Sequence, residues 1–264
     1  MFPVLIQIGP IIIYSLWLFA GLGFLLGVFI FTQLAHKKRL NINFIYNHSF
    51  GLFIWALIGS RLVFLIRNFS YYFPEFTTQN VIHGLFIWDK GLSLIGGLMG
   101  LAVALFYYTK KEKEQTKKWF DILTIAVLFA LATGHLGTFL DGSAYGNITS
   151  LPWGMIFDNP SIKYAVPIHP IQLYSFLFTI ILALSLFIYY RKKRPSAGKT
   201  TSIGVGVYSL YLFLQGFIRG DDVLIIAGLR EEQWFGIIIL IILIGVQSLK
   251  RYNNQRALKQ SDPT

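Results

Sequence analysis

The sequence predicts an all-α polytopic membrane protein with about seven transmembrane helices. Hydrophobic residues make up 55% of the 264 residues and charged residues only 13%, which is too little polar material to cover a soluble protein of this size. A membrane span needs about 20 mostly apolar residues. Seven such segments occur, at residues 10–34, 50–67, 92–109, 119–140, 171–190, 203–218 and 234–249, and the second, third and sixth of them are short.

The positions of the basic residues predict how these spans are oriented. Of the 23 Lys and Arg residues, 17 fall on one side of the membrane when the spans are threaded in order, in residues 37–39, 110–118, 191–199 and the tail from residue 250. Cytoplasmic loops carry an excess of Lys and Arg, so we expect the amino terminus outside and the carboxyl terminus in the cytoplasm. The net charge of +11 therefore reflects topology and argues against a nucleic-acid partner.

We expect a single transmembrane helical domain over residues 1–252, followed by a disordered cytoplasmic tail at residues 253–264. The amino-terminal segment lacks a basic region, so a cleaved signal peptide is not expected. The absence of cysteine excludes disulfide bonds, a thiolate nucleophile and a cysteine metal site. We expect no metal and no other cofactor.

Polar residues in the fourth span form the first candidate site. Helical spacing places Gly134, Gly137 and Asp141 along one stripe, with His135 and Thr138 beside it. We expect this flat polar edge to face a neighbouring helix. The alternative is tight helix packing with a histidine at the interface.

A second group of polar residues runs along the sixth span. Tyr208, Tyr211, Gln215, Arg219 and Asp222 are separated by 3, 4, 4 and 3 residues, which is the helical repeat, so they should share one face. A polar stripe that faces lipid is improbable, and we expect it to line a cavity opposite the glycine edge of the fourth span. The alternative is that Arg219 only reaches the interface with a flexible side chain.

Two further positions are singled out by charge and by spacing. His169, Gln172 and Tyr174 surround the start of the fifth span, where His169 has the alternative role of capping a helix end. Arg61 lies within the second span, where a charged side chain costs about 3 kcal/mol and therefore needs a partner. The long segment 142–169, rich in aromatic and turn-forming residues, is expected to lie along the membrane surface and to cover the site.

These clusters, in this order, resemble the bacterial phosphatidylglycerol–prolipoprotein diacylglyceryl transferases, which move a diacylglyceryl group onto the lipobox cysteine of lipoprotein precursors. The resemblance implies seven spans, the outer face of the bacterial cytoplasmic (inner) membrane, and phosphatidylglycerol and prolipoprotein signal peptides as partners in lipoprotein biosynthesis. It rests on Ile8-Gly9-Pro10, Gly59-Ser60-Arg61, the segment from Trp88 to Gly100, the segment from Gly134 to Gly142, and His169 to Tyr174.

The chain departs from the family pattern at several motif positions. The signature arginine and asparagine of the fourth span are His135 and Thr138 here. Of the family's Arg-x-x-x-Glu-x-x-Arg in the sixth span, only the last arginine, Arg219, is present. The other differing positions are Ile95 in place of histidine, Ser143 and Ser175 in place of glutamate, and Leu212 and Gly216 in place of the first arginine and the glutamate.

The transfer reaction needs a donor-rich pocket for the phosphate, a base for the thiol and an apolar route for two acyl chains. We assign His135 and Asp141 as candidate catalytic residues, with His135 as the base if it is neutral or as a phosphate partner if it is protonated. Two alternatives stay open, namely an inactive family member that binds lipid or a membrane partner, and a different lipid-head-group transferase on the same scaffold. The candidate lipid-binding residues are Arg219, Arg61, Thr138, His169, Gln172, Tyr174, Tyr208, Gln215 and Asp222.

Overall fold

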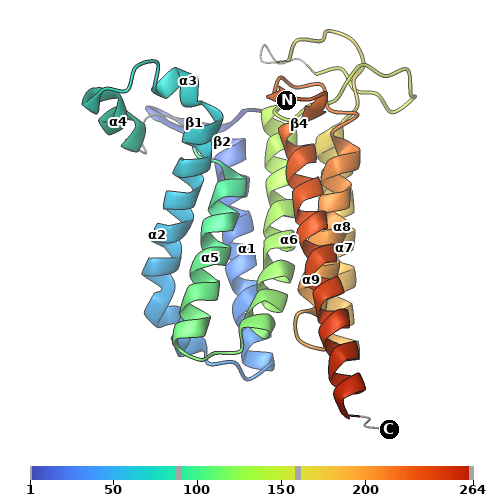
Figure 1. The fold of residues 1–264 in the computed structure, drawn as a ribbon. Coiled ribbons are helices and arrows are strands. Elements are labelled where there is room, and N and C mark those ends of the chain that lie inside the picture. Colours follow the sequence, from blue (N-terminus) through green and yellow to red (C-terminus); the bar gives the residue numbers. More distant parts are fainter. Residues whose placement is uncertain (1, 87–90, 158–161, 262–264) are drawn as a thin grey trace. The chain divides into compact units, whose positions relative to one another are not determined.

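The computed structural model describes residues 2–86, 91–157 and 162–261, and most of them are helical (Figure 1). The chain divides into two compact units. Unit 1 comprises Met1–Phe31 and Leu123–Thr264, and unit 2 comprises Thr32–Ile122. Because the boundaries fall within the helices α1 (Ser15–Lys37) and α6 (Thr116–Asp141), each of these helices contributes to both units.

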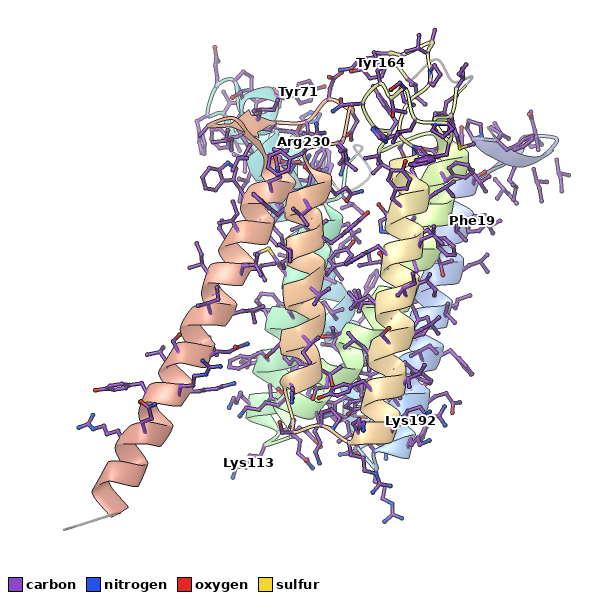
Figure 2. The ribbon with its side chains drawn as sticks, turned by 90° about the vertical axis from the view of Figure 1, so that its right-hand side faces the viewer. Phe19, Tyr71, Lys113, Tyr164, Lys192 and Arg230 are labelled. Carbon is purple, nitrogen blue, oxygen red and sulfur yellow. The ribbon has the colours of Figure 1, made fainter. Side chains whose placement is uncertain are left out.

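Unit 1 combines long helices with two short hairpins. Helices α7, α8 and α9 run side by side (Figure 2). Helix α8 lies so close to α6 and α7 at Gly204 that a Cβ atom there would lie 2.6 Å from Thr124 Cγ2 and 2.8 Å from Leu186 Cδ1. Besides most of α1 and α6, the unit contains β1 (Val4–Ile8), β2 (Ile11–Tyr14), α7 (Ile171–Lys193), α8 (Lys199–Gln215), β3 (Ile225–Ile226), β4 (Leu229–Arg230) and α9 (Glu231–Ser261).

Unit 2 is built on two helices that pack through glycines. A Cβ atom on Gly59 of α2 would overlap the Gly96 carbonyl oxygen of α5, and a Cβ atom on Gly96 would overlap that of Gly59. Small residues allow helix backbones to approach closely, which stabilises helix pairs in membranes. The elements of this unit are α2 (Ile42–Arg67), α3 (Phe69–Tyr72), α4 (Thr78–Leu85) and α5 (Leu94–Lys111), with the first turns of α6.

Helical membrane architecture is confirmed. Among the described residues, five helices are long and apolar enough to cross a membrane, namely α1, α2, α6, α7 and the Glu231–Asn253 part of α9. Helices α5 and α8 have 18 and 17 residues. At 1.5 Å per residue they are about 26 Å long, somewhat shorter than a hydrocarbon core of roughly 30 Å.

The structure corrects the predicted boundaries of the first two spans. The first span was expected from residue 10, but residues 11–14 form β2 and the helix begins at Ser15. The β-branched run from Ile11 to Ile13 favours a strand, and Gly9, at φ 56°, supplies the positive φ that a tight turn requires. The second span begins at Ile42, eight residues earlier than predicted.

The predicted ends of the last two spans also differ from the structure. Helix α8 ends at Gln215, three residues before the expected end, and Gly216 follows as its cap. Helix α9 continues to Ser261, so residues 253–261 are helical where the sequence predicts a disordered tail. The segment from Trp88 to Lys90 of the glycine-rich motif lies outside the described residues.

The connection from α6 to α7 has a small core of its own. Tyr145, Phe157, Ile162 and Ile168 are all at most 8% exposed and pack together. Met155 and Ile168 exchange backbone hydrogen bonds of 3.0 Å in both directions. Side-chain packing and backbone hydrogen bonds therefore stabilise this irregular segment, which extends to the beginning of α7.

Candidate active site around His135 and Arg219

Helix α6 presents His135 on the side opposite its contact with α1. A Cβ atom on Gly137 would lie 2.8 Å from Phe19 Cβ and 3.3 Å from Leu16 Cα, so this glycine faces α1. Two residues correspond to about 200° around a helix, which directs His135 away from α1. The glycine edge of the fourth predicted span, which is α6, was expected to face the sixth, which is α8. For Gly137 this expectation is wrong.

The imidazole of His135 carries a buried polar atom. Its Nε2 is buried and has no hydrogen-bond partner among the described residues. The positive charge of Arg219 acts on the ring electrostatically, so the two side chains that were predicted to share a site are near one another. A buried nitrogen of this kind fits a proton acceptor or a hydrogen-bond donor to a ligand.

The two other candidate residues of α6 have different surroundings. Thr138 Oγ1 donates to the His135 carbonyl oxygen at 2.9 Å, which is a bond within the helix. Asp141 is the last residue of α6 and is followed by Gly142 with φ 85°. An orienting role of Asp141 for His135 stays a prediction.

Backbone hydrogen bonds fix the segment that carries Arg219. Gly146 donates to the His169 carbonyl oxygen at 3.2 Å, and His169 donates to that of Asn147 at 3.0 Å. On the other side, Asn147 donates to Ile218 at 2.9 Å. The loop after α6 thus pairs with the segments before α7 and after α8. The sequence pattern suggests that α8 continues beyond Gln215, but this pairing takes the place of further helix.

Arg219 belongs to a network of two arginines and two carboxylates. Its Nε donates to Asp221 Oδ1 at 2.9 Å, its Nη2 donates to Asp221 Oδ2, and its Nη1 lies 3.2 Å from Glu232 Oε1. Arg230 Nη2 donates to the same Asp221 Oδ1 at 2.7 Å. All four side chains are at most 16% exposed. The sequence interpretation missed Arg230, Asp221 and Glu232 as members of the site.

The carboxylates keep Arg219 charged. Burial alone would lower the pKa of Arg219, but its hydrogen bond to Asp221 and the charges of Glu232, Asp221 and Glu231 outweigh that effect, and the pKa lies above its ordinary value. A permanent cation with a planar set of donors is suited to a phosphate or a carboxylate.

The polar face of α8 contacts α7 and extends towards Arg219. Gln215 Nε2 donates to Ser175 Oγ at 2.6 Å, and the Tyr211 hydroxyl forms a 2.9 Å hydrogen bond with the same oxygen. The Tyr208 and Tyr211 rings are 6.1 Å apart, and the charge of Arg219 acts on both. The helical stripe therefore holds for Tyr208, Tyr211 and Gln215.

The helical stripe does not include Asp222. Because α8 ends at Gln215, Arg219 and Asp222 lie beyond the helix rather than on its face. Asp222 pairs instead with Lys163 at 2.7 Å, and its side chain is 86% exposed. The acids that contact Arg219 are Asp221 and Glu232.

The candidate residues around the start of α7 form two separate sets of contacts. Gln172 is fully buried and donates to the Ser143 carbonyl oxygen at 2.8 Å, while its Oε1 has no hydrogen-bond partner in the described part of the chain. His169 Nδ1 lies 3.3 Å from the Tyr174 hydroxyl, which also accepts from Trp153 Nε1 at 2.8 Å. Gln172 thus holds the loop after α6, whereas His169 and Tyr174 contact an exposed tryptophan.

Comparison with known proteins identifies the family. A family model described as prolipoprotein diacylglyceryl transferase matches residues 3–248. The chain belongs to the prolipoprotein diacylglyceryl transferase family. Three similar proteins, each named phosphatidylglycerol–prolipoprotein diacylglyceryl transferase, are from Clostridium tetani (28% identity over 254 residues, 96% of this chain and 99% of the relative), Polynucleobacter asymbioticus (34% over 200 residues, 74% and 73%) and Aliivibrio salmonicida (32% over 228 residues, 83% and 76%).

Membership of this transferase family confirms the resemblance found in the sequence, and the structure explains one departure from the family pattern. Gly216 stands where the family pattern has glutamate. A Cβ atom there would overlap Gln233 Cγ of α9, so Gln233 fills that space. Gln233 is 2% exposed, donates to the Phe213 carbonyl oxygen at 3.0 Å and accepts from the Arg230 backbone at 2.9 Å. Position 216 of this chain therefore has no room for a side chain beside Gln233.

Arg61, the remaining candidate, belongs to unit 2. It is 5% exposed, its Nε donates to the Gly84 carbonyl oxygen at 2.8 Å, and its Nη1 donates to that of Gly91 at 3.0 Å. Its guanidinium also lies over the Phe64 and Tyr72 rings, at 5.4 and 5.2 Å from their centroids. Arg61 therefore stabilises the connection between α2 and α5 by hydrogen bonds to its backbone. Ile95, in place of the family histidine, is half-buried in α5.

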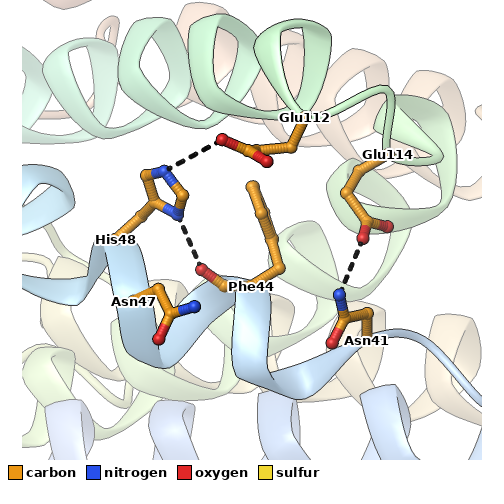
Figure 3. A pocket seen from close by; sticks show the side chains of 6 residues that line it. All are labelled: Asn41, Phe44, Asn47, His48, Glu112 and Glu114. Atoms are coloured by element: carbon orange, nitrogen blue, oxygen red, sulfur yellow. Dashed lines mark hydrogen bonds and ion pairs between the residues drawn. The ribbon is translucent and has the colours of Figure 1, made fainter.

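Unit 2 contains a polar pocket that includes none of the predicted site residues (Figure 3). Its volume is about 190 Å³. His48 Nε2 lies 3.8 Å from Glu112 Oε1, and Asn41 Nδ2 donates to Glu114 Oε1 at 3.2 Å (Figure 3). These contacts join the beginning of α2 to the end of α5 and the turn that follows it.

Proposed function

We propose that the protein transfers the diacylglyceryl group of phosphatidylglycerol to the lipobox cysteine thiol of prolipoproteins. Family membership and the names of the relatives support this reaction. The observation that carries it to this chain is the buried Nε2 of His135, which has no hydrogen bond to a described residue and lies within electrostatic reach of Arg219. A base and a phosphate-binding cation are the two groups that the reaction needs.

The chemistry assigns one step to each of these side chains. The cysteine thiol gives its proton to His135 Nε2, and the thiolate attacks the glycerol carbon that carries the phosphate. A carbon–sulfur bond forms, the carbon–oxygen bond to the phosphate breaks, and glycerol phosphate leaves. Arg219 stabilises the negative charge that develops on the leaving phosphate. Because the proton and the phosphate charge go to different residues, one imidazole need not serve both.

The contacts give the other candidates different degrees of support. Tyr208 and Gln215 share the polar face near Arg219, and Gln172 fixes the loop that follows α6. Roles of Asp141, His169 and Tyr174 in binding or catalysis stay predictions. Thr138, Asp222 and Arg61 make the contacts within the protein described above, and lipid binding by them also stays a prediction.

The proposed setting is the outer face of the bacterial cytoplasmic membrane. In this arrangement seven helices, α1, α2 and α5 to α9, cross the bilayer as one transmembrane domain with the amino terminus outside. The basic last turns of α1, α5 and α7 support a cytoplasmic location of those ends. The opposite ends, with Arg219 and His135, then lie near the outer lipid head groups.

A bacterium depleted of its own transferase provides the test, with the mass of a model lipoprotein as the readout. We expect the wild-type chain to restore growth and lipid modification, and His135→Gln to abolish both without loss of expression. His48→Gln, which removes a histidine of unit 2, is the matched control and should retain activity. Full activity of His135→Gln would remove this residue from the mechanism. Failure of a folded wild-type chain would favour an inactive, lipid-binding family member.

A further inference from the structure

Two guanidinium groups converge on one oxygen atom in unit 1. Asp221 Oδ1 accepts from Arg219 Nε at 2.9 Å and from Arg230 Nη2 at 2.7 Å. Arg219 binds this carboxylate with two donors, and Arg230 also donates to the Asp221 carbonyl oxygen at 2.7 Å. An anion is therefore already bound between the two arginines, and it is supplied by the protein itself.

The hydrogen-bonding capacity of this cluster is not used up. Arg230 Nε and Glu232 Oε2 are both buried, and neither forms a hydrogen bond to a described residue. They are 3.9 Å apart, which permits an ion pair but is too far for a hydrogen bond. Buried polar groups in native proteins are nearly always hydrogen-bonded, so these two atoms have donor and acceptor capacity left for a ligand.

Arg230 is held in place by several local contacts. It ends β4, directly before the first turn of α9, and is labelled in Figure 2. The β3–β4 hairpin turns through Ala227 and Gly228, both with positive φ. The Arg230 backbone donates to Gln233 Oε1 at 2.9 Å, and its Nη1 donates to the Arg219 carbonyl oxygen at 3.3 Å.

We propose that Arg219 and Arg230 form a two-arginine clamp for the lipid phosphate, which the Asp221 carboxylate occupies until a phosphate replaces it. This inference rests on the proposed function. A carboxylate and a phosphate present the same pair of oxygens to a guanidinium group, so one can substitute for the other. Arg230 then supplies the second arginine that Leu212 cannot provide on α8.

There is a physical reason for the position of the Asp221 carboxylate between the two arginines. Two guanidinium groups that are at most 16% exposed would repel each other and lose hydration without carboxylates beside them, and Asp221 supplies one of these together with Glu232. Asp221 lies two residues after Arg219, in a segment without helix or strand, so its side chain can leave the clamp without unfolding an element. The exchange of one anion for another keeps the local charge nearly constant.

Binding of a short-chain lipid to the purified full-length protein tests the clamp. The probes are dioctanoyl phosphatidylglycerol, dioctanoyl phosphatidylcholine and inorganic phosphate, and the readout is the apparent Kd from the lipid-dependent rise in the unfolding midpoint. Arg230→Gln should weaken phosphatidylglycerol binding roughly tenfold or more, since a charged hydrogen bond is lost. Asp221→Asn should tighten it severalfold, because the competing carboxylate is gone.

Two further variants separate the clamp from general charge and folding effects. Lys163→Gln removes one positive charge from the exposed Lys163–Asp222 pair and should leave the Kd within about twofold. Arg230→Lys keeps the charge but loses the planar donors, and should lie between wild type and Arg230→Gln. If Arg230→Gln does not fold, Arg230→Lys and Asp221→Asn still decide the matter.

The outcomes distinguish the clamp from the proposed function. Unchanged phosphatidylglycerol binding in a folded Arg230 variant, or weaker binding in Asp221→Asn, would overturn the clamp alone if the wild type still binds this lipid and modifies lipoprotein. A wild type without preference for phosphatidylglycerol over phosphatidylcholine and without activity would overturn the proposed function. If inorganic phosphate binds as tightly as the lipid, the clamp is a site for free phosphate and the lipid assignment is wrong.

Discussion

Gln233 of α9 occupies the space beside Gly216 at the end of α8. The side chain is 2% exposed and bonds both the Phe213 carbonyl oxygen and the Arg230 backbone. A single glutamine thus joins the end of α8 to the hairpin that carries Arg230. Any side chain at position 216 must displace it, because even a Cβ atom would overlap Gln233 Cγ.

Introducing the family's glutamate as Gly216→Glu should therefore destabilise unit 1 rather than restore a site. We expect a cost of about 2 kcal/mol or more, from overpacking and from the displaced buried amide. The measurement is the unfolding midpoint in detergent. Gly216→Glu combined with Gln233→Ala should recover part of the loss, since the smaller side chain frees the space. Equal destabilisation in the single and double variants would contradict the proposed contact.

Glycine packing between α2 and α5 gives a second prediction. Gly59→Leu should separate these helices and lower the unfolding midpoint, because the new side chain overlaps the Gly96 carbonyl oxygen and Gly100. Gly245→Leu on α9 is the matched control, since a Cβ atom there meets nothing within 4 Å. A similar midpoint for both variants would argue against close packing of α2 on α5.

The positions of the long helices could be predicted because hydropathy depends only on local sequence. Each of the seven predicted segments overlaps a helix, and five of these helices are long and apolar enough to cross a membrane. The ends of the helices depend on interactions that hydropathy does not report. Because β2 pairs with β1 in a hairpin, helix α1 begins only at Ser15. The hydrogen bond from Asn147 to the Ile218 carbonyl oxygen redirects the chain after α8.

Part of the candidate site could be predicted because polar residues stand out in apolar segments of a sequence. His135 and Arg219 are polar residues within or beside apolar spans, which marks them in the sequence. Arg230 and Glu232 look like ordinary charges at the head of a span, and only the fold brings them to Arg219. A signal was present in the run Arg230 to Glu232, three charged residues that precede an apolar segment with only Gln233 between them.

Arg61 offers a prediction about the connection between α2 and α5. Arg61→Gln should release the carbonyl oxygens of Gly84 and Gly91, which its Nε and Nη1 now bind. We expect faster cleavage in this connection by a protease added to the purified protein, because local opening becomes easier. Lys111→Gln, at the exposed last turn of α5, is the control and should leave the cleavage rate unchanged. Unaltered cleavage in Arg61→Gln would assign Arg61 a role other than holding this segment.

Membrane orientation yields the last prediction, and the natural absence of cysteine makes it direct to test. Single cysteines at Tyr71 and Lys163 should react with a membrane-impermeant thiol reagent in intact cells, because both residues are exposed and belong to segments predicted to lie outside. Cysteines at Lys111 and Lys193, in the basic last turns of α5 and α7, should react only after the membrane is permeabilised. The Lys111 and Lys193 substitutions each remove only one of the 17 basic residues on the expected cytoplasmic side. The charge asymmetry that sets the orientation is therefore preserved. The reverse pattern, with position 193 labelled and position 163 protected in intact cells, would invert the topology and would place Arg219 and His135 at the cytoplasmic face.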